Sequence, residues 1–193
     1  HKAIRRQRQM CIRDRFYLFL ADGFEETEAL APLDMMRRAK IEVKTVGVTG
    51  EFVTGSHGVT VKADLKPEEI SFNNIDGVVL PGGMPGTINL GKSETVTKAA
   101  VYCAENGKIT AAICAAPSVL GNLGILKGKK ATCFPGFEKE LEGATYTAAP
   151  VEIDGNVITG KGAGCAILFG KAIVEKAVSA EAANKVCGDM QCP

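Results

Sequence analysis

Residues 108–126 read KITAAICAAPSVLGNLGIL and join a strand pattern directly to a helix pattern. Residues 108–114 are mostly apolar, which is typical of a strand buried on both faces of a parallel sheet. Residues 116–126 then show apolar side chains at helical spacing, with Pro117 at the start, where a helix tolerates proline best. Cys114 is therefore predicted to lie at a strand-to-helix turn.

The same alternation of strand and helix patterns extends over most of the chain. Strands are predicted at 16–21, 41–48, 51–54, 58–63, 77–83, 108–114 and 129–134, with a hairpin from Tyr146 to Thr159 that turns at Asp154-Gly155. Helices are predicted at 25–39, 93–106, 116–126 and 163–178, and Pro32 is expected to kink or shorten the first. This order predicts an α/β fold with a mostly parallel, doubly wound sheet, and 193 residues suit a single domain.

Charge is distributed unevenly along the chain. Residues 1–15 hold six Lys/Arg and one Asp, whereas the remaining residues hold 17 basic and 21 acidic side chains. An acidic body has no general attraction for a phosphate backbone, so nucleic acid is not expected as a partner. We interpret 1–15 as a basic extension that is non-native or disordered, and 16–193 as the folded domain.

The cysteines and the apolar runs indicate the compartment. The seven cysteines are odd in number, have scattered spacing and form no CxxC pair, which favours free thiols in a reducing, cytoplasmic setting. No run of about 18 apolar residues occurs, so no membrane span is expected. The only histidines are His1 and His57, which argues against a Cys/His zinc site.

Cys114 is the first candidate for chemistry. A cysteine between small residues at a strand-to-helix turn suits a nucleophile, and a helix amino terminus lowers a thiol pKa. The alternative is an ordinary buried cysteine. Gly82 and Gly83 end another predicted strand, and their N–H groups could bind an anion or could simply form a tight turn.

Glu28 lies in the first turn of the helix predicted at 25–39. Acidic residues there compensate the helix dipole, and we expect Glu25 and Glu26 to do only that. A glutamate that points into an apolar pocket beside a thiol would instead have a raised pKa and could donate a hydrogen bond to a thiolate.

Several stretches in order resemble the ThiJ/PfpI superfamily, in the branch that contains the protein deglycase linked to Parkinson disease. These stretches are LADGFEETEALAPLDMMRRA, GSHGVTVKADL, VVLPGGMPG, AAICAAPSVLG and GKGAG, and the resemblance runs from about Phe16 to Val178. It implies a flavodoxin-like sandwich, a homodimer and no cofactor.

The resemblance also implies roles for particular residues. Cys114 corresponds to an oxidation-sensitive nucleophile, and Glu28 to a protonated carboxylic acid that hydrogen-bonds its sulfur. The N–H groups of Gly82, Gly83 and Ala115 correspond to an oxyanion or sulfinate pocket. His57 corresponds to a polar or basic residue near that pocket.

Two departures from the family pattern bear on activity. Ala115 stands where family proteases have histidine, and Thr132-Cys133-Phe134-Pro135 replaces the Thr-His-Pro segment of deglycase-like members. We therefore predict a stress-protective protein with a peroxide-sensitive Cys114 and cofactor-independent glyoxalase or deglycase activity on α-oxoaldehydes or their adducts. The alternative is a non-enzymatic redox sensor or chaperone-like binding protein. A protease or a class I amidotransferase is disfavoured, because no histidine follows His57.

Overall fold

A six-stranded sheet forms the centre of the structure, a computed structural model that describes residues 15–192. Its strands in chain order are β1 (Arg15–Leu20), β2 (Glu42–Gly47), β5 (Ile75–Leu80), β6 (Ile109–Ile113), β9 (Val151–Asp154) and β10 (Val157–Gly160). Their spatial order is β2-β1-β5-β6-β10-β9, and every neighbouring pair is parallel except β9 and β10. The predicted parallel, doubly wound sheet and the predicted hairpin near the carboxyl terminus are confirmed.

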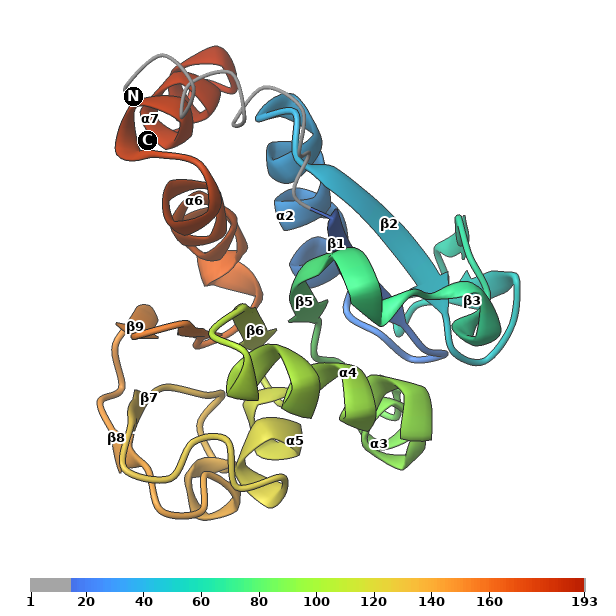
Figure 1. Cartoon of the computed structure of the whole chain (residues 1–193), viewed down its shortest axis with the longest axis vertical. Helices are drawn as coiled ribbons and strands as arrows, with labels where there is room; N and C mark the ends of the chain where they lie inside the picture. Colours follow the sequence, from blue (N-terminus) through green and yellow to red (C-terminus); the bar gives the residue numbers. More distant parts are fainter. Residues whose placement is uncertain (1–14, 193) are drawn as a thin grey trace.

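Helices cover both faces of this sheet. They are α2 (Glu26–Arg38), α3 (Gly86–Lys92), α4 (Glu94–Glu105), α5 (Pro117–Asn122), α6 (Ala166–Ala177) and α7 (Ala180–Asp189). Helices α2, α6 and α7 lie on one side of the sheet, and α3, α4 and α5 lie on the other (Figure 1). The arrangement is the flavodoxin-like sandwich that the sequence indicated.

Strand β1 explains why the sheet needs two layers of helices. Phe16, Leu18 and Leu20 pack into the core beneath α2 and α6, whereas Tyr17 and Phe19 pack into the core beneath α4 and α5. All five side chains are almost completely buried. Successive side chains of a strand point to opposite faces, so a continuously apolar strand is stable only when both faces are covered.

Two predicted elements are shorter than expected. The helix predicted at 116–126 ends at Asn122, and Gly124 follows in a left-handed conformation at φ +74°. The strand predicted at 129–134 shrinks to β7 (Lys130–Ala131), which pairs with β8 (Thr145–Tyr146). Beyond Ala131 the backbone N–H groups no longer take part in the pairing of β7 with β8. The N–H of Thr132 donates to the hydroxyl of Thr159, and the N–H of Phe134 donates to the carbonyl of Cys114.

The structure also contains more helix than the prediction. Helix α2 continues through Pro32, which is buried and packs closely against Gly170 of α6. Helices α3 and α7 were not predicted. The short strands at 51–54 and 58–63 are confirmed as the antiparallel hairpin β3 (Phe52–Thr54) and β4 (Thr60–Lys62).

Arg15, which was predicted to belong to the basic extension, is part of the central sheet. Arg15 is the first residue of β1, where its N–H donates to Asp76 over 3.2 Å and its side chain pairs with Glu42 at 3.4 Å. The rest of the predicted basic extension, residues 1–14, lies outside the described residues.

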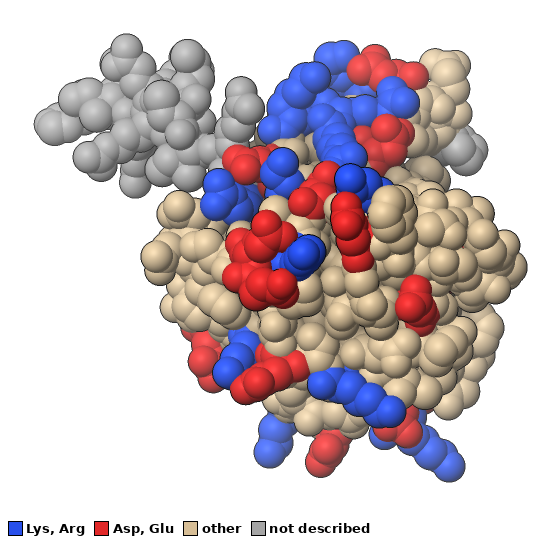
Figure 2. Space-filling model, turned by 90° about the vertical axis from the view of Figure 1, so that its right-hand side faces the viewer, with Lys and Arg blue, Asp and Glu red and all other residues tan. Residues whose placement is uncertain are grey.

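Charged side chains are interspersed on the face drawn in Figure 2, where acidic and basic groups alternate with large uncharged areas. Among the helices of residues 15–192, none is long and apolar enough to cross a membrane.

The topology brings three strand ends together. Strand β1 lies between β2 and β5, so the order of strands reverses there, and β6 follows β5. In such sheets ligands bind beyond the carboxyl ends of the strands, near the reversal. The residues that follow β1, β5 and β6 are therefore the place to look for a site.

Candidate active site

Cys114 occupies a strained turn between β6 and α5. Its φ is +64°, a left-handed value that is uncommon for any residue other than glycine. The N–H of Cys114 donates to the carbonyl of Gly160, and its carbonyl accepts from the N–H of Phe134, each over 2.9 Å. These two hydrogen bonds stabilise a conformation that presents the half-buried thiol at the end of the sheet.

Glu28 reaches the same place from the first turn of α2. Its side chain is completely buried, and its Oε2 accepts a 2.9 Å hydrogen bond from the N–H of Gly82. The carboxyl group also lies beside Cys114, since both side chains border Gly82. The second oxygen, Oε1, is buried and has no hydrogen-bond partner among the described residues.

Gly82 lies between these two side chains. A β-carbon at this position would come within 2.6 Å of Glu28 Oε2 and 2.7 Å of the Cys114 β-carbon, so no larger residue fits without displacing one of them. The sequence assigned the Gly82 N–H to an oxyanion pocket. The structure instead directs this N–H to the Glu28 carboxyl group.

The sulfur of Cys114 faces two backbone donors, the N–H groups of Gly83 and Ala115. The carbonyl group of each donor residue accepts a hydrogen bond that fixes its position. The Ala115 carbonyl accepts a 2.6 Å hydrogen bond from the Ser118 hydroxyl, and the Gly83 carbonyl accepts one of 2.9 Å from the Thr87 N–H. Sequence reasoning missed Ser118 and Thr87, although Ser118 follows the nucleophile by one helical turn.

Burial raises the pKa of Glu28 to about 7, and the negative charge of Glu25 adds to this effect. Hydrogen bonds with the Cys114 thiol and the Gly82 N–H act in the opposite direction. Glu28 therefore keeps a proton at pH values where an exposed glutamate is ionised.

The pKa of Cys114 corrects the expectation of a lowered value. Burial raises it to about 12, and the charge of Glu28 contributes in the same direction, whereas the N–H groups of Ala115 and Gly83 lower it.

Cys114 and Glu28 titrate as a pair. The repulsion that raises the thiol pKa exists only while Glu28 is ionised, so a protonated Glu28 makes the thiolate easier to form. The pair therefore loses one proton near neutral pH and the second only at high pH. Between these two pH values the pair carries one negative charge and one proton.

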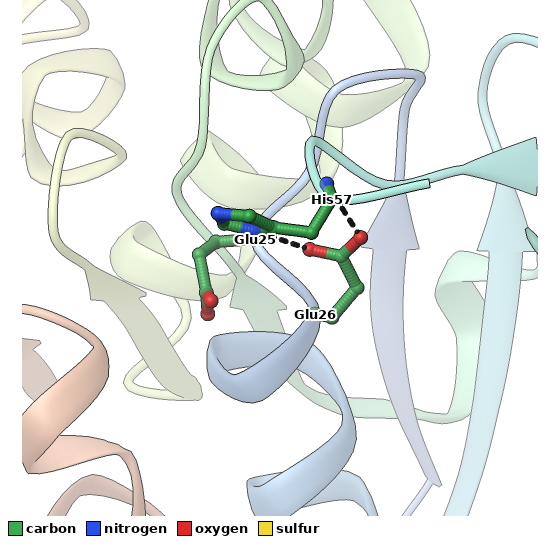
Figure 3. Close-up of side chains that lie close together, drawn as sticks. All are labelled: Glu25, Glu26 and His57. Atoms are coloured by element: carbon green, nitrogen blue, oxygen red, sulfur yellow. Dashed lines mark hydrogen bonds and ion pairs between the residues drawn. The ribbon is translucent and has the colours of Figure 1, made fainter. Parts of the chain in front are cut away.

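His57 lies in the turn between β3 and β4, and it pairs with Glu26 (Figure 3). Its Nδ1 is 2.9 Å from Glu26 Oε2, and its backbone N–H donates to Oε1 over 2.8 Å. Burial tends to raise the pKa of Glu26, but hydrogen bonds led by that from His57 lower it to about 2. None of the hydrogen bonds found in residues 15–192 joins the His57 ring to Cys114.

Glu25, Glu26 and His57 are the one group in the described part of the chain that could offer three metal ligands, with one atom of each within 4.8 Å of the others. Each carboxylate already has a structural role. Glu25 Oε2 accepts from the Glu28 N–H over 2.7 Å and so caps α2, and both oxygens of Glu26 hold the β3–β4 turn. The contacts explain the cluster without an ion.

A cavity of about 420 Å³ adjoins the candidate site. It lies among α3, α5 and residues 136–140, and its lining includes Thr87 and Ser118, the two residues behind the backbone donors. Cys114 is not part of that lining.

Comparisons with known proteins support the sequence resemblance. The model of the DJ-1/PfpI family matches residues 14–176. The Parkinson disease protein 7 homolog of Danio rerio is 38% identical over 179 residues, covering 89% of this chain and 94% of that protein. A protein named deglycase from Pyrococcus abyssi is 32% identical over 150 residues, covering 76% and 89%.

Solved structures agree with these relatives. The oxidized DJ-1 of Toxoplasma gondii superposes with a TM-score of 0.88 at 32% identity and covers 92% of this chain and 98% of that one. Some relatives are longer: this chain spans 40% and 44% of two DJ-1 homologs of Arabidopsis thaliana, to which it is 35% and 34% identical.

The raised pKa of Glu28 predicts a pH-dependent stability. Between pH 4.5 and about 7 the folded chain keeps a proton that the unfolded chain has lost, so stability is full at lower pH and falls as the pH rises through this window. Relative to Glu28→Gln, which stays neutral, the wild type should lose up to about 3 kcal/mol. Denaturant unfolding at a series of pH values measures this loss, with the exposed Glu175→Gln as control. Equal pH slopes for wild type and Glu28→Gln would contradict the assignment.

Proposed function

This chain belongs to the DJ-1/PfpI family, and we propose that it is a stress-protective protein in which Cys114 attacks α-oxoaldehydes or their adducts without a cofactor. One contact carries the proposal: the carboxyl group of Glu28, whose burial raises its pKa to about 7, lies beside the Cys114 thiol at the end of β6. The deglycase names of archaeal relatives support the same chemistry. A homodimer and a cytoplasmic location remain predictions.

The proposed reaction starts when the Cys114 thiol passes its proton to the Glu28 carboxylate and becomes a thiolate. Its sulfur adds to the aldehyde carbon of an α-oxoaldehyde, and the N–H groups of Gly83 and Ala115 stabilise the oxyanion that forms. Transfer of a proton from the former aldehyde carbon to the neighbouring carbon converts the hemithioacetal into a thioester. Water then hydrolyses the thioester, releases a 2-hydroxy acid and restores the thiol.

Glu28 is the residue that can move this proton. The segment that carries a histidine in deglycase-like relatives passes next to Cys114, because the Phe134 N–H bonds to the Cys114 carbonyl, but it supplies no imidazole. Cys133 of that segment is fully buried, and burial raises its pKa to about 11. A general base works best when its pKa is near the working pH, which describes Glu28 and not Cys133.

Conversion of methylglyoxal to lactate tests this activity. Cys114→Ser should abolish it, and Glu28→Gln should lower kcat by about 10² or more, because it removes the proton carrier and keeps the shape. Cys165→Ser, at another half-exposed thiol, should retain wild-type turnover. Turnover by Cys114→Ser at the wild-type rate would contradict the proposed nucleophile.

A second function, peroxide sensing, is favoured by the donors around the sulfur. A sulfinate formed on Cys114 would meet the N–H groups of Gly83 and Ala115 and the protonated Glu28. Hydrogen bonds to an anionic acceptor are among the stronger ones in proteins, so this environment would stabilise the sulfinic state.

Mild peroxide should therefore add two oxygen atoms to Cys114 without unfolding the protein. Glu28→Asp withdraws the carboxyl group by one methylene, so we expect it to change the oxidation state reached at a fixed peroxide dose. Intact mass gives the readout, with circular dichroism as the control for folding. If Glu28→Asp and Glu28→Gln both gain two oxygens at the wild-type dose and rate, Glu28 does not take part.

A further inference from the structure

The carboxyl end of α7 holds two cysteines in one helix-capping turn. The N–H of Cys192 donates to the carbonyl of Cys187 over 2.9 Å, and the N–H of Gln191 donates to that of Gly188 over 3.1 Å. Gln191 adopts a left-handed conformation at φ +55°. These three features define a Schellman motif, in which the first hydrogen bond closes six residues and the second closes four within them.

This motif brings the side chains of its first and last residues into contact. Here those residues are Cys187 and Cys192, and both thiols are free and half-buried. A disulfide requires α-carbons about 4.4–6.8 Å apart, and a direct backbone hydrogen bond between the two residues brings their α-carbons close together. Burial, and after it the neighbouring Cys192 thiol, raise the pKa of Cys187, which is a further sign that the thiols face each other.

We propose that Cys187 and Cys192 form a peroxide-responsive disulfide, an oxidation site separate from Cys114. Hydrogen peroxide transfers one oxygen atom to one thiol, which becomes a sulfenic acid, and its other oxygen atom leaves as water. The second thiol then attacks the sulfenic sulfur, the S–S bond forms and a second water leaves. Two thiols and one peroxide thus give one disulfide and two waters.

Two of the other described cysteines are less accessible to peroxide. Cys103 and Cys133 are fully buried, and burial raises the pKa of Cys103 to about 12. The thiolate is the form that peroxide attacks, so these residues should react slowly. Cys187 has Lys171 of α6 nearby, whose positive charge favours its thiolate.

A disulfide between Cys187 and Cys192 would stabilise the packing of α7. Cys187 and Met190 pack against the core that α2, α6 and α7 share with the sheet. A disulfide would hold the last turn of α7 closed and restrict the unfolded chain, so the oxidised protein should melt at a higher temperature than the reduced protein.

Peptide mapping of the full-length Cys114→Ser protein tests the proposal. Trypsin cleaves after Lys185 and leaves Cys187 and Cys192 in one peptide that begins at Val186. After limited hydrogen peroxide this peptide should lose two hydrogen atoms and resist alkylation, and dithiothreitol should restore both alkylation sites. Oxidation of Met190 in the same peptide is recognised separately, because it adds oxygen.

The single variants Cys187→Ser and Cys192→Ser are the matched controls. Each should accumulate a sulfenic acid that dimedone traps, and neither should give a peptide that has lost two hydrogen atoms. The proposal is overturned if both cysteines of the Cys114→Ser protein remain open to alkylation after peroxide. It is equally overturned if either forms its disulfide with a different cysteine or with a second chain.

Discussion

The contact between the buried carboxyl group of Glu28 and the thiol of Cys114 constrains the protonation of both groups and the backbone beside them. Two acidic groups in an apolar place cannot both ionise near neutral pH, so the pair keeps one proton. The contact needs Gly82 beside it, because a β-carbon there would collide with both side chains. It also needs the left-handed turn at Cys114, which is held in place by a hydrogen bond that Cys114 donates to β10 and by one that it accepts from the segment after β7. The proposed nucleophilic attack and the proposed peroxide sensing would both use this proton.

The fold could be predicted where the sequence pattern and the packing agree. The apolar runs of β1, β5 and β6 indicated strands buried on both sides, and the structure covers both sides with helices. Prediction failed where local signals were weak or were overridden. Helix α3 contains two glycines, which gave it no clear helix pattern, whereas Ser179 caps the amino end of α7 and was a signal that could have been used. Pro32 did not break α2, because its packing against α6 compensates for the lost hydrogen bond.

The residues of the candidate site could be predicted from the sequence, but the pKa of Cys114 could not. The turn pattern and the resemblance both indicated Cys114, Glu28 and the glycines after β5, and the structure brings them together. The direction of the Cys114 pKa could not be read from the sequence, because it depends on depth of burial and on the carboxyl group that arrives from α2. Glu26 was predicted to serve only the helix dipole, yet it anchors the β3–β4 turn through His57, a contact between residues 31 positions apart.

The protonation of Glu28 in the folded protein is the most direct test of this account. Carbon-13 labelling of the glutamate side chains allows each carboxyl group to be titrated by nuclear magnetic resonance, and comparison with Glu28→Gln identifies the signal of Glu28. The account predicts that this carboxyl group titrates near pH 7, far from the ordinary value of 4.5. A signal that titrates at the ordinary value would show that Glu28 is ionised beside Cys114 at neutral pH, and would contradict the shared proton on which the proposed chemistry depends.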